Sequence, residues 1–151
     1  MTYLEKITFL TGNFLQVSQF VIKNAYRVIC LTEGKNKETH YLSKSPEYIE
    51  GYESLARSYI IKNESLSGQQ LITFFENHVG LSKKDFNDLV KILKKRDYLV
   101  SYFFIENSPK MAREEVAVYE SLIKELNEYI ELANKLNVSL AKACDRLYDM
   151  F

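Results

Sequence analysis

An apolar stripe with helical spacing runs uninterrupted through the last third of the chain and limits the fold more than any other feature. Its members recur at intervals of three and four residues: Tyr119, Leu122, Leu126, Tyr129, Ala133, Leu136, Leu140, Ala143 and Leu147. This spacing lines one side of an α-helix, whereas a β-strand would alternate at every second residue. We expect Ser108 and Pro109 to cap and begin this helix.

Counted from that start, the last helix would be a rod of ~60 Å, which is longer than a domain of this size needs. The simplest interpretation is a core stripe inside one antiparallel bundle. The alternatives are a bend near residues 137–139, or an end that leaves the bundle and packs on another chain.

Similar patterns cover most of the remaining chain. They predict helices over about residues 3–33, 47–62, 69–78 and 82–105, the last of them with a capping box at Ser82 and Asp85, and a surface loop over 35–46 that contains His40. Five Gly and two Pro among 151 residues are too few turn-formers for many short strands. The predicted fold is therefore all-α, an up-and-down bundle of four or five helices with a long C-terminal helix, forming one domain over residues 1–151.

The cysteines and the hydropathy bear on the compartment. Cys30 and Cys144 fit no metal-ligand spacing, so we interpret both as buried thiols in a reducing compartment. The first residues lack the pattern of a secretory signal. The longest uncharged stretch, residues 7–22, falls short of the ~20 mostly apolar residues of a membrane span. We expect a cytoplasmic protein without membrane association.

Motifs of the common enzyme classes are missing from the sequence. There is no Gly-rich phosphate loop, and the two histidines, His40 and His78, form no zinc motif. Glu76 and His78 are two residues apart, whereas a di-iron helix needs a Glu and a His three apart. We predict neither a cofactor nor a metal, and we expect His78 to interact with the carboxyl end of its own helix.

A local excess of positive charge stands out, because the 20 basic and 20 acidic residues of the chain cancel overall. From Lys83 to Arg96 six residues are basic and two are acidic, and a strongly apolar segment follows. A solvated helix face followed by core aromatics would explain this window. A nucleic-acid contact confined to the same short segment would explain it as well.

The end of this window resembles the motif of the HEPN superfamily, the small all-α proteins of prokaryotic toxin–antitoxin and phage-defence systems. That motif is an Arg, usually a polar residue, three further residues and a His, with aromatics just after it. The first part is matched by Arg96, Asp97, Tyr98, Leu99 and Val100, and the trailing aromatics by Tyr102, Phe103 and Phe104. The position of the His holds Ser101.

The resemblance implies the ancestry of a metal-independent endoribonuclease, in which the Arg and the His of two subunits meet in a dimer cleft. Arg96 would hold a phosphate, Asp97 would orient Arg96, and Ser101 would stand in place of the acid–base His. A serine hydroxyl with no base beside it does not move that proton at pH 7, so we expect no nuclease activity. A natural non-catalytic protein, an inactivating replacement and an accidental match are the three explanations of Ser101.

The predicted function is thus a toxin or defence component directed at RNA, with Lys94, Lys95, Tyr98 and Tyr102 as the RNA-binding side chains. We expect a homodimer with the motif at its two-fold interface, and an antitoxin protein as a further partner. The alternative is a non-catalytic binding or scaffold protein, whose stripe from Tyr119 to Leu147 meets a partner helix.

Overall fold

The computed structural model describes residues 1–35, 46–113 and 115–150, and this part of the chain consists of helices and short connections. In chain order the helices are α1 (Tyr3–Lys35), α2 (Pro46–Lys62), α3 (Gly68–Glu76), α4 (Lys83–Ser101), α5 (Phe103–Ala112) and α6 (Val116–Asp149). The prediction of an all-α bundle with a long C-terminal helix is confirmed. The described helices number six rather than four or five, because the predicted helix over 82–105 is divided.

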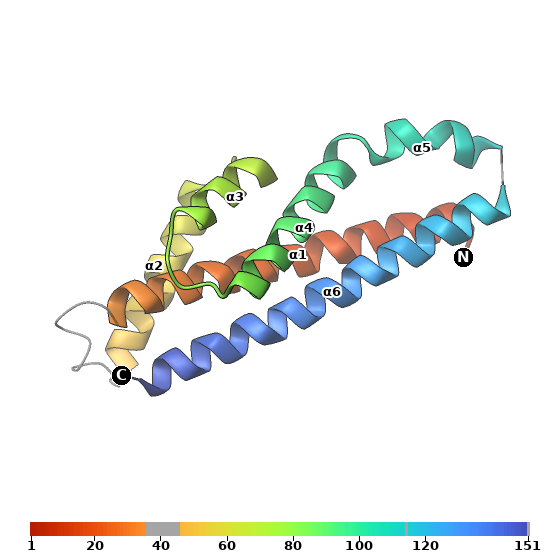
Figure 1. Ribbon diagram of the computed structural model, residues 1–151. Coiled ribbons are helices and arrows are strands. Elements are labelled where there is room, and N and C mark those ends of the chain that lie inside the picture. Colours follow the sequence, from red (N-terminus) through yellow and green to blue (C-terminus); the bar gives the residue numbers. More distant parts are fainter. Residues whose placement is uncertain (36–45, 114, 151) are drawn as a thin grey trace.

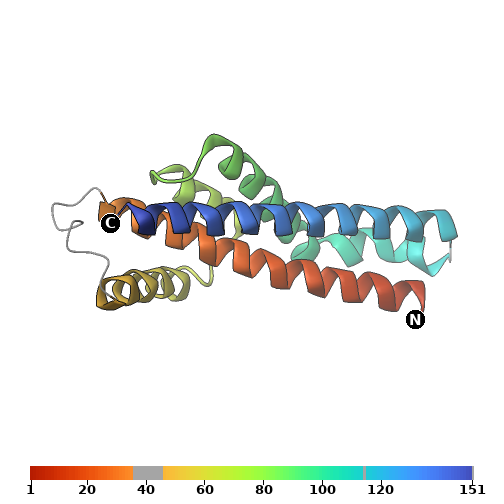
Figure 2. The same cartoon turned by 90° about the horizontal axis from the view of Figure 1, so that it is seen from below.

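The two longest helices, α1 and α6, lie side by side along their whole length and form the base of the molecule (Figures 1 and 2). Contacts between them join Tyr3 to Tyr119, Phe14 to Tyr129, and Asn24 to Asn137, so residue numbers rise together along the pair. The pair is therefore parallel, and the predicted antiparallel arrangement is wrong for it. The four shorter helices, α2 to α5, lead the chain back from the end of α1 to the start of α6.

The stripe of the last helix is buried inside the chain that carries it. Tyr119, Leu126, Ala133, Leu136 and Leu140 all belong to the core, and α6 continues unbroken through residues 137–139. The core-stripe interpretation is thus confirmed, and the buried Leu140 and Cys144 show that the end of the helix stays in the core of its own chain. A helix of 34 residues spans about 51 Å, a length that α1 with its 33 residues matches.

The chain turns at Tyr102, between α4 and α5, and the start predicted for the last helix is wrong. Pro109 lies inside α5, and the last helix begins at Val116. Instead of capping a new helix, the Ser108 hydroxyl donates to the Phe104 carbonyl one turn back. Phe103, Asn107 and Met111 are buried at four-residue spacing, so burial of this face holds the segment helical despite the proline.

Side-chain caps define two helix starts. Ser67 and Gln70 form a reciprocal capping box at α3. At α4 the Ser82 hydroxyl accepts from the Asp85 amide as predicted, but the Asp85 carboxylate instead accepts a hydrogen bond from Ser139 of α6, at 2.9 Å. The second half of the predicted box is therefore replaced by a link between helices.

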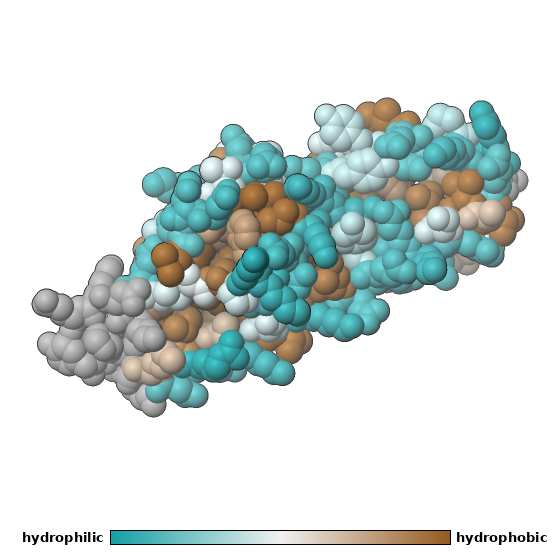
Figure 3. Space-filling view, in the orientation of Figure 1, coloured by the Kyte–Doolittle hydropathy of each residue, from teal (hydrophilic) through white to brown (hydrophobic). Residues whose placement is uncertain are grey.

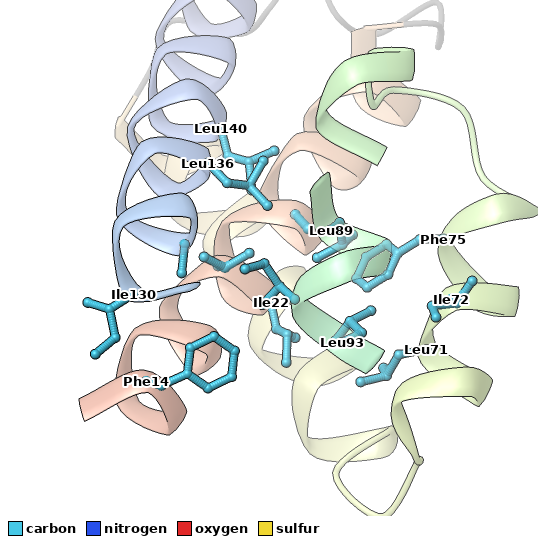
Figure 4. Packing of buried hydrophobic residues seen from close by; sticks show 14 of the residues in the cluster. Phe14, Ile22, Leu71, Ile72, Phe75, Leu89, Leu93, Ile130, Leu136 and Leu140 are labelled. Atoms are coloured by element: carbon cyan, nitrogen blue, oxygen red, sulfur yellow. The ribbon is translucent and has the colours of Figure 1, made fainter. Parts of the chain in front are cut away.

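The core lies between α1, α6 and the helices above them. In Figure 4, Leu71 and Phe75 of α3 face Leu89 and Leu93 of α4, while Phe14 and Ile130 lie on the side of α1 and α6. Both cysteines are buried in this core, as predicted.

Two further predictions concern the histidines and the membrane. His78 Nδ1 lies 2.6 Å from the Phe74 carbonyl, which confirms the expected contact with the end of its helix. His40 lies outside the described residues. Among the described helices there is none whose length and hydropathy suit a membrane crossing.

Candidate functional site

Arg96 lies in the wall of a pocket of about 230 Å³ between α1, α3, α4 and the end of α2. Arg96 lies four residues after Ile92 and three before Leu99, which places it on the buried side of α4, and its side chain is half-buried. The other residues of the pocket come from well-separated parts of the sequence: Gln19, Ile22, Tyr26, Ile60, Asn63, Glu64 and Leu71.

The guanidinium of Arg96 is incompletely paired. Its Nη1 atom is buried, and no described residue accepts a hydrogen bond from it. Glu64 also lines the pocket, but its side chain is exposed and no ion pair within 4 Å joins it to Arg96 in the described part of the chain. An arginine stays charged at all ordinary pH values, and a buried donor without an acceptor is costly, so the pocket favours an anionic group.

Tyr26 lines the same pocket, and the charge of Arg96 affects the pKa of its hydroxyl. Asn63 Nδ2 donates to the Tyr26 hydroxyl at 3.2 Å, and the Tyr26 ring stacks on Tyr59. Burial raises the pKa of the Tyr26 hydroxyl, although the hydrogen bond from Asn63 and the positive charge of Arg96 act in the opposite direction. The hydroxyl therefore stays neutral at pH 7 and remains a hydrogen-bonding group of the pocket.

Asp97 is occupied by a structural contact. Its carboxylate accepts a hydrogen bond of 2.7 Å from the Gly68 amide at the first turn of α3. A carboxylate at a helix amino terminus is favourable because it meets unpaired N–H groups and the positive end of the helix dipole. Within the described residues no hydrogen bond joins Asp97 to Arg96, so its place in the structure is that of a cap and not of the predicted orienting group.

Lys95 does not lie on an exposed surface, as its predicted RNA contact would require. Its side chain is 6% exposed, and its Nζ atom lies 2.8 Å from Glu125 Oε1 of α6. The same nitrogen lies 5.2 Å from the centre of the Tyr98 ring and 4.8 Å from that of Tyr129. Lys95 therefore ties α4 to α6 through an ion pair and cation–π contacts.

Tyr98 is also engaged, at the turn from α4 to α5. Its hydroxyl donates to Glu106 at 2.7 Å and accepts from Asn107 at 3.2 Å. Burial, and next the hydrogen bond to Glu106, raise the pKa of this hydroxyl. These contacts hold the turn that sequence reasoning did not find.

Lys94, Ser101 and Tyr102 are exposed, and Tyr102 is exposed to 63%. Ser101 is not among the residues that line the pocket of Arg96, so the two motif positions do not share this pocket. The turn carries three exposed apolar side chains, those of Val100, Tyr102 and Ile105. On the face shown in Figure 3, hydrophilic side chains surround separate hydrophobic patches.

The motif thus divides into two groups. Arg96, Lys94, Ser101 and Tyr102 are available to a ligand or near a pocket, whereas the other predicted site residues hold helices together. Sequence reasoning missed Gln19, Tyr26 and Asn63, which complete the pocket. No local signal could have found them, because they meet Arg96 only once α1, α2 and α4 are packed.

Neither a metal site nor a known relative assigns a role to this pocket. In the described ranges 1–35, 46–113 and 115–150, no group of three or more His, Cys, Asp or Glu residues is arranged to hold a metal ion. Comparison of the chain with family models, curated proteins and solved structures finds no match.

Proposed function

We propose that this protein is an RNA-directed toxin or defence component, similar to HEPN proteins. It would bind an RNA phosphate at Arg96 without cleaving the RNA. The observation that supports this most is the buried Nη1 atom of Arg96, which has no acceptor in the described residues. A guanidinium recognises a phosphate by paired, charge-assisted hydrogen bonds. The amides of Gln19 and Asn63 line the same pocket and can add neutral donors.

The surface of α4 carries further positive charge, on the side of the helix turned away from Arg96. Lys83, Lys91 and Lys94 are exposed, and none of them forms an ion pair within the described residues, whereas Lys84 lies 3.7 Å from Asp88. Unpaired surface lysines attract a phosphate backbone in a salt-dependent way. Tyr102 offers an exposed ring on which a base can stack.

The absence of cleavage follows from the motif. Acid–base chemistry at neutral pH needs a group that titrates there, and a serine hydroxyl does not. In this proposal the protein acts as a homodimer, with an antitoxin protein as a further partner. Two copies of one weak basic site on the same RNA raise the overall affinity.

Binding of a fluorescent single-stranded RNA, followed by anisotropy, tests the proposal. We expect Arg96→Gln to weaken binding about tenfold, while Arg146→Gln, which removes the same charge from an exposed position near the end of α6, changes it less than about twofold. Equal effects of the two variants, or no binding by the unaltered protein in low salt, would refute the proposal.

Replacing Ser101 with His tests the ancestry that the motif implies. We expect Ser101→His to produce a metal-independent ribonuclease that slows growth when expressed, and a further Arg96→Ala change to abolish the activity. An inactive Ser101→His protein that still binds RNA would limit the function to binding. Loss of both properties would remove the resemblance as an argument.

The alternative function, a scaffold whose last helix meets a partner through the stripe from Tyr119 to Leu147, is not the better proposal. The stripe is buried against the chain's own core and offers no free face.

A further inference from the structure

The pocket of Arg96 has a buried inner side and an exposed mouth. Ile22, Tyr26 and Leu71 are at most 8% exposed and form the inner side. Gln19 and Glu64 are exposed and form the mouth. With a volume of about 230 Å³, the pocket is smaller than the ~300–1,000 Å³ of sites that enclose a drug-sized molecule. A ligand therefore enters it with one small group.

Two hydrogen-bond donors of this pocket have no acceptor in the described residues. One is the buried Nη1 atom of Arg96. The other is the Tyr26 hydroxyl, which accepts from Asn63 but donates its own proton to no described residue, although Tyr26 is 0% exposed. A hydroxyl can accept and donate at the same time. The two donors together favour a group with several acceptor oxygens.

The Tyr26 hydroxyl is held in place by the packing of its ring. The ring stacks on Tyr59 and contacts the rings of Phe74 and Phe75, with centroids 6.0, 5.3 and 4.9 Å away. A donor fixed in this way loses little conformational entropy when a ligand binds.

The charges at the pocket suit the end of a strand better than its middle. Among the described residues that line it, Arg96 is the cation and Glu64 the anion, and no lysine is present. The exposed lysines of α4 lie on the other side of that helix. An internal phosphodiester would bring a phosphate on each side of it past Glu64, whereas an end group has a neighbouring phosphate on one side only.

We propose that this pocket receives the terminal phosphate monoester of an RNA strand and not an internal phosphodiester. A monoester has three acceptor oxygens and a charge of about −1.5 to −2 at pH 7, and a diester has fewer free oxygens and less charge. Arg96 and Tyr26 donate to these oxygens, and Glu64 accepts from the 2′-hydroxyl of the terminal ribose. The inference rests on the proposed function, because it specifies which part of the RNA meets Arg96.

Competition measured by fluorescence anisotropy tests this inference. A single-stranded RNA labelled on an internal base is displaced by three unlabelled strands of one sequence, with hydroxyls at both ends, with a 5′-phosphate or with a 3′-phosphate. We expect at least one phosphorylated strand to bind about tenfold more tightly than the hydroxyl-ended strand, which identifies the end that is recognised. Arg96→Gln should abolish this preference, and Arg146→Gln should retain it.

Tyr26→Phe tests the second donor, because it removes the hydroxyl and keeps the ring. We expect it to reduce the preference for the phosphorylated strand at least about threefold. The matched control is Tyr59→Phe, which removes the hydroxyl of the ring stacked on Tyr26 and should leave the preference unchanged. Far-ultraviolet circular dichroism establishes that each variant is folded.

The outcomes separate this inference from the proposed function. Equal binding of all three strands by the unaltered protein would overturn the inference and leave RNA binding intact. A preference that persists in Arg96→Gln would also overturn it, since the terminal phosphate would then bind elsewhere. Binding of none of the strands in low salt would refute the proposed function itself.

Discussion

Gly68, the first residue of α3, should be far less tolerant of a methyl group than its position suggests. A Cβ atom there would lie 2.5 Å from the backbone oxygen of Leu93 and 2.8 Å from both Cγ and Oδ2 of Asp97. Non-bonded atoms normally stay above about 3.3 Å, so α3 and α4 would have to separate by nearly 1 Å. The Leu93 oxygen belongs to the α4 backbone and cannot rotate away.

The cost can be built up from two contributions. Overpacking of this kind costs about 1–3 kcal/mol. The hydrogen bond from the Gly68 amide to the Asp97 carboxylate is weakened at the same time, and bonds to charged groups contribute about 1.5–3 kcal/mol. We expect Gly68→Ala to lower the free energy of unfolding by about 2–4 kcal/mol. Gly51→Ala, in open space within α2, should raise it by up to about 1 kcal/mol.

Urea unfolding followed by circular dichroism at the helix band measures both variants, with the midpoint shifting and the slope unchanged. The double variant Gly68→Ala/Asp97→Ala separates the contributions. It removes the contact with the carboxylate but keeps the one with the Leu93 oxygen, so it should remain destabilised. A Gly68→Ala protein as stable as the unaltered chain would refute the packing of α3 on α4 described above.

Two further predictions concern single side chains. Lys94→Gln should weaken RNA binding about threefold and reduce its salt dependence, because Lys94 is exposed, whereas Lys95→Met should leave binding within about twofold and lower stability by about 1 kcal/mol through loss of the Glu125 ion pair. Anisotropy titrations at several salt concentrations and urea unfolding check both, and a larger binding loss in Lys95→Met would contradict the assignment. Burial raises the pKa of the Cys144 thiol from its ordinary 9.0 to about 11, so the folded state favours the neutral thiol. The contribution of the neutral thiol to the free energy of unfolding is complete below pH 9 and is lost as the pH rises through 11. Between these pH values Cys144→Ala should lose about 2 kcal/mol less of its unfolding free energy than the unaltered protein, and parallel curves would disprove this.

The periodic stripes predicted the long helices well, because burial of one face determines where α1 and α6 form. Their relative direction was not predictable in this way. A stripe has the same spacing read in either direction, and the parallel order depends on contacts such as Asn24 with Asn137, which join positions far apart in the sequence. The turn at Tyr102 was missed for a related reason. The local sequence stays apolar through it, and the contacts of Tyr98 with Glu106 and Asn107 that hold it lie across the turn.

The wrong start predicted for the last helix came from the local preference of Pro109. Its local preference suits the first turn of a helix, and Ser108 before it suits a cap. The row of Phe103, Asn107 and Met111 outweighs that preference, because all three are buried when residues 103–112 form one helix. Tertiary burial decided a boundary that local propensity placed several residues earlier.

For the site, the helical phase of each charged residue held more information than its charge. Lys95 lies three residues after Ile92 and four before Leu99, on the buried row of α4, so its spacing alone indicates a core position that Lys94 lacks. Asp85 and Asn107 lie on apolar rows in the same way, and each has a partner on a neighbouring element. A polar side chain on an apolar row therefore predicts a buried hydrogen bond or ion pair between helices.

An apolar row does not identify the partner of its polar side chain, because the partner depends on which helices pack together. Arg96 shows the consequence for function. It lies four residues after Ile92 and three before Leu99, so its spacing also places it on the buried side of α4, yet its side chain is only half-buried and its Nη1 atom lacks an acceptor in the described residues. Lys95 and Arg96 both lie toward the buried side of α4, but Lys95 meets Glu125 of α6, whereas Arg96 lines the pocket with residues of α1 and α3. A partly desolvated charge that faces a pocket and has a buried donor without an acceptor in the described residues makes Arg96 the residue of this motif best placed to hold an anion.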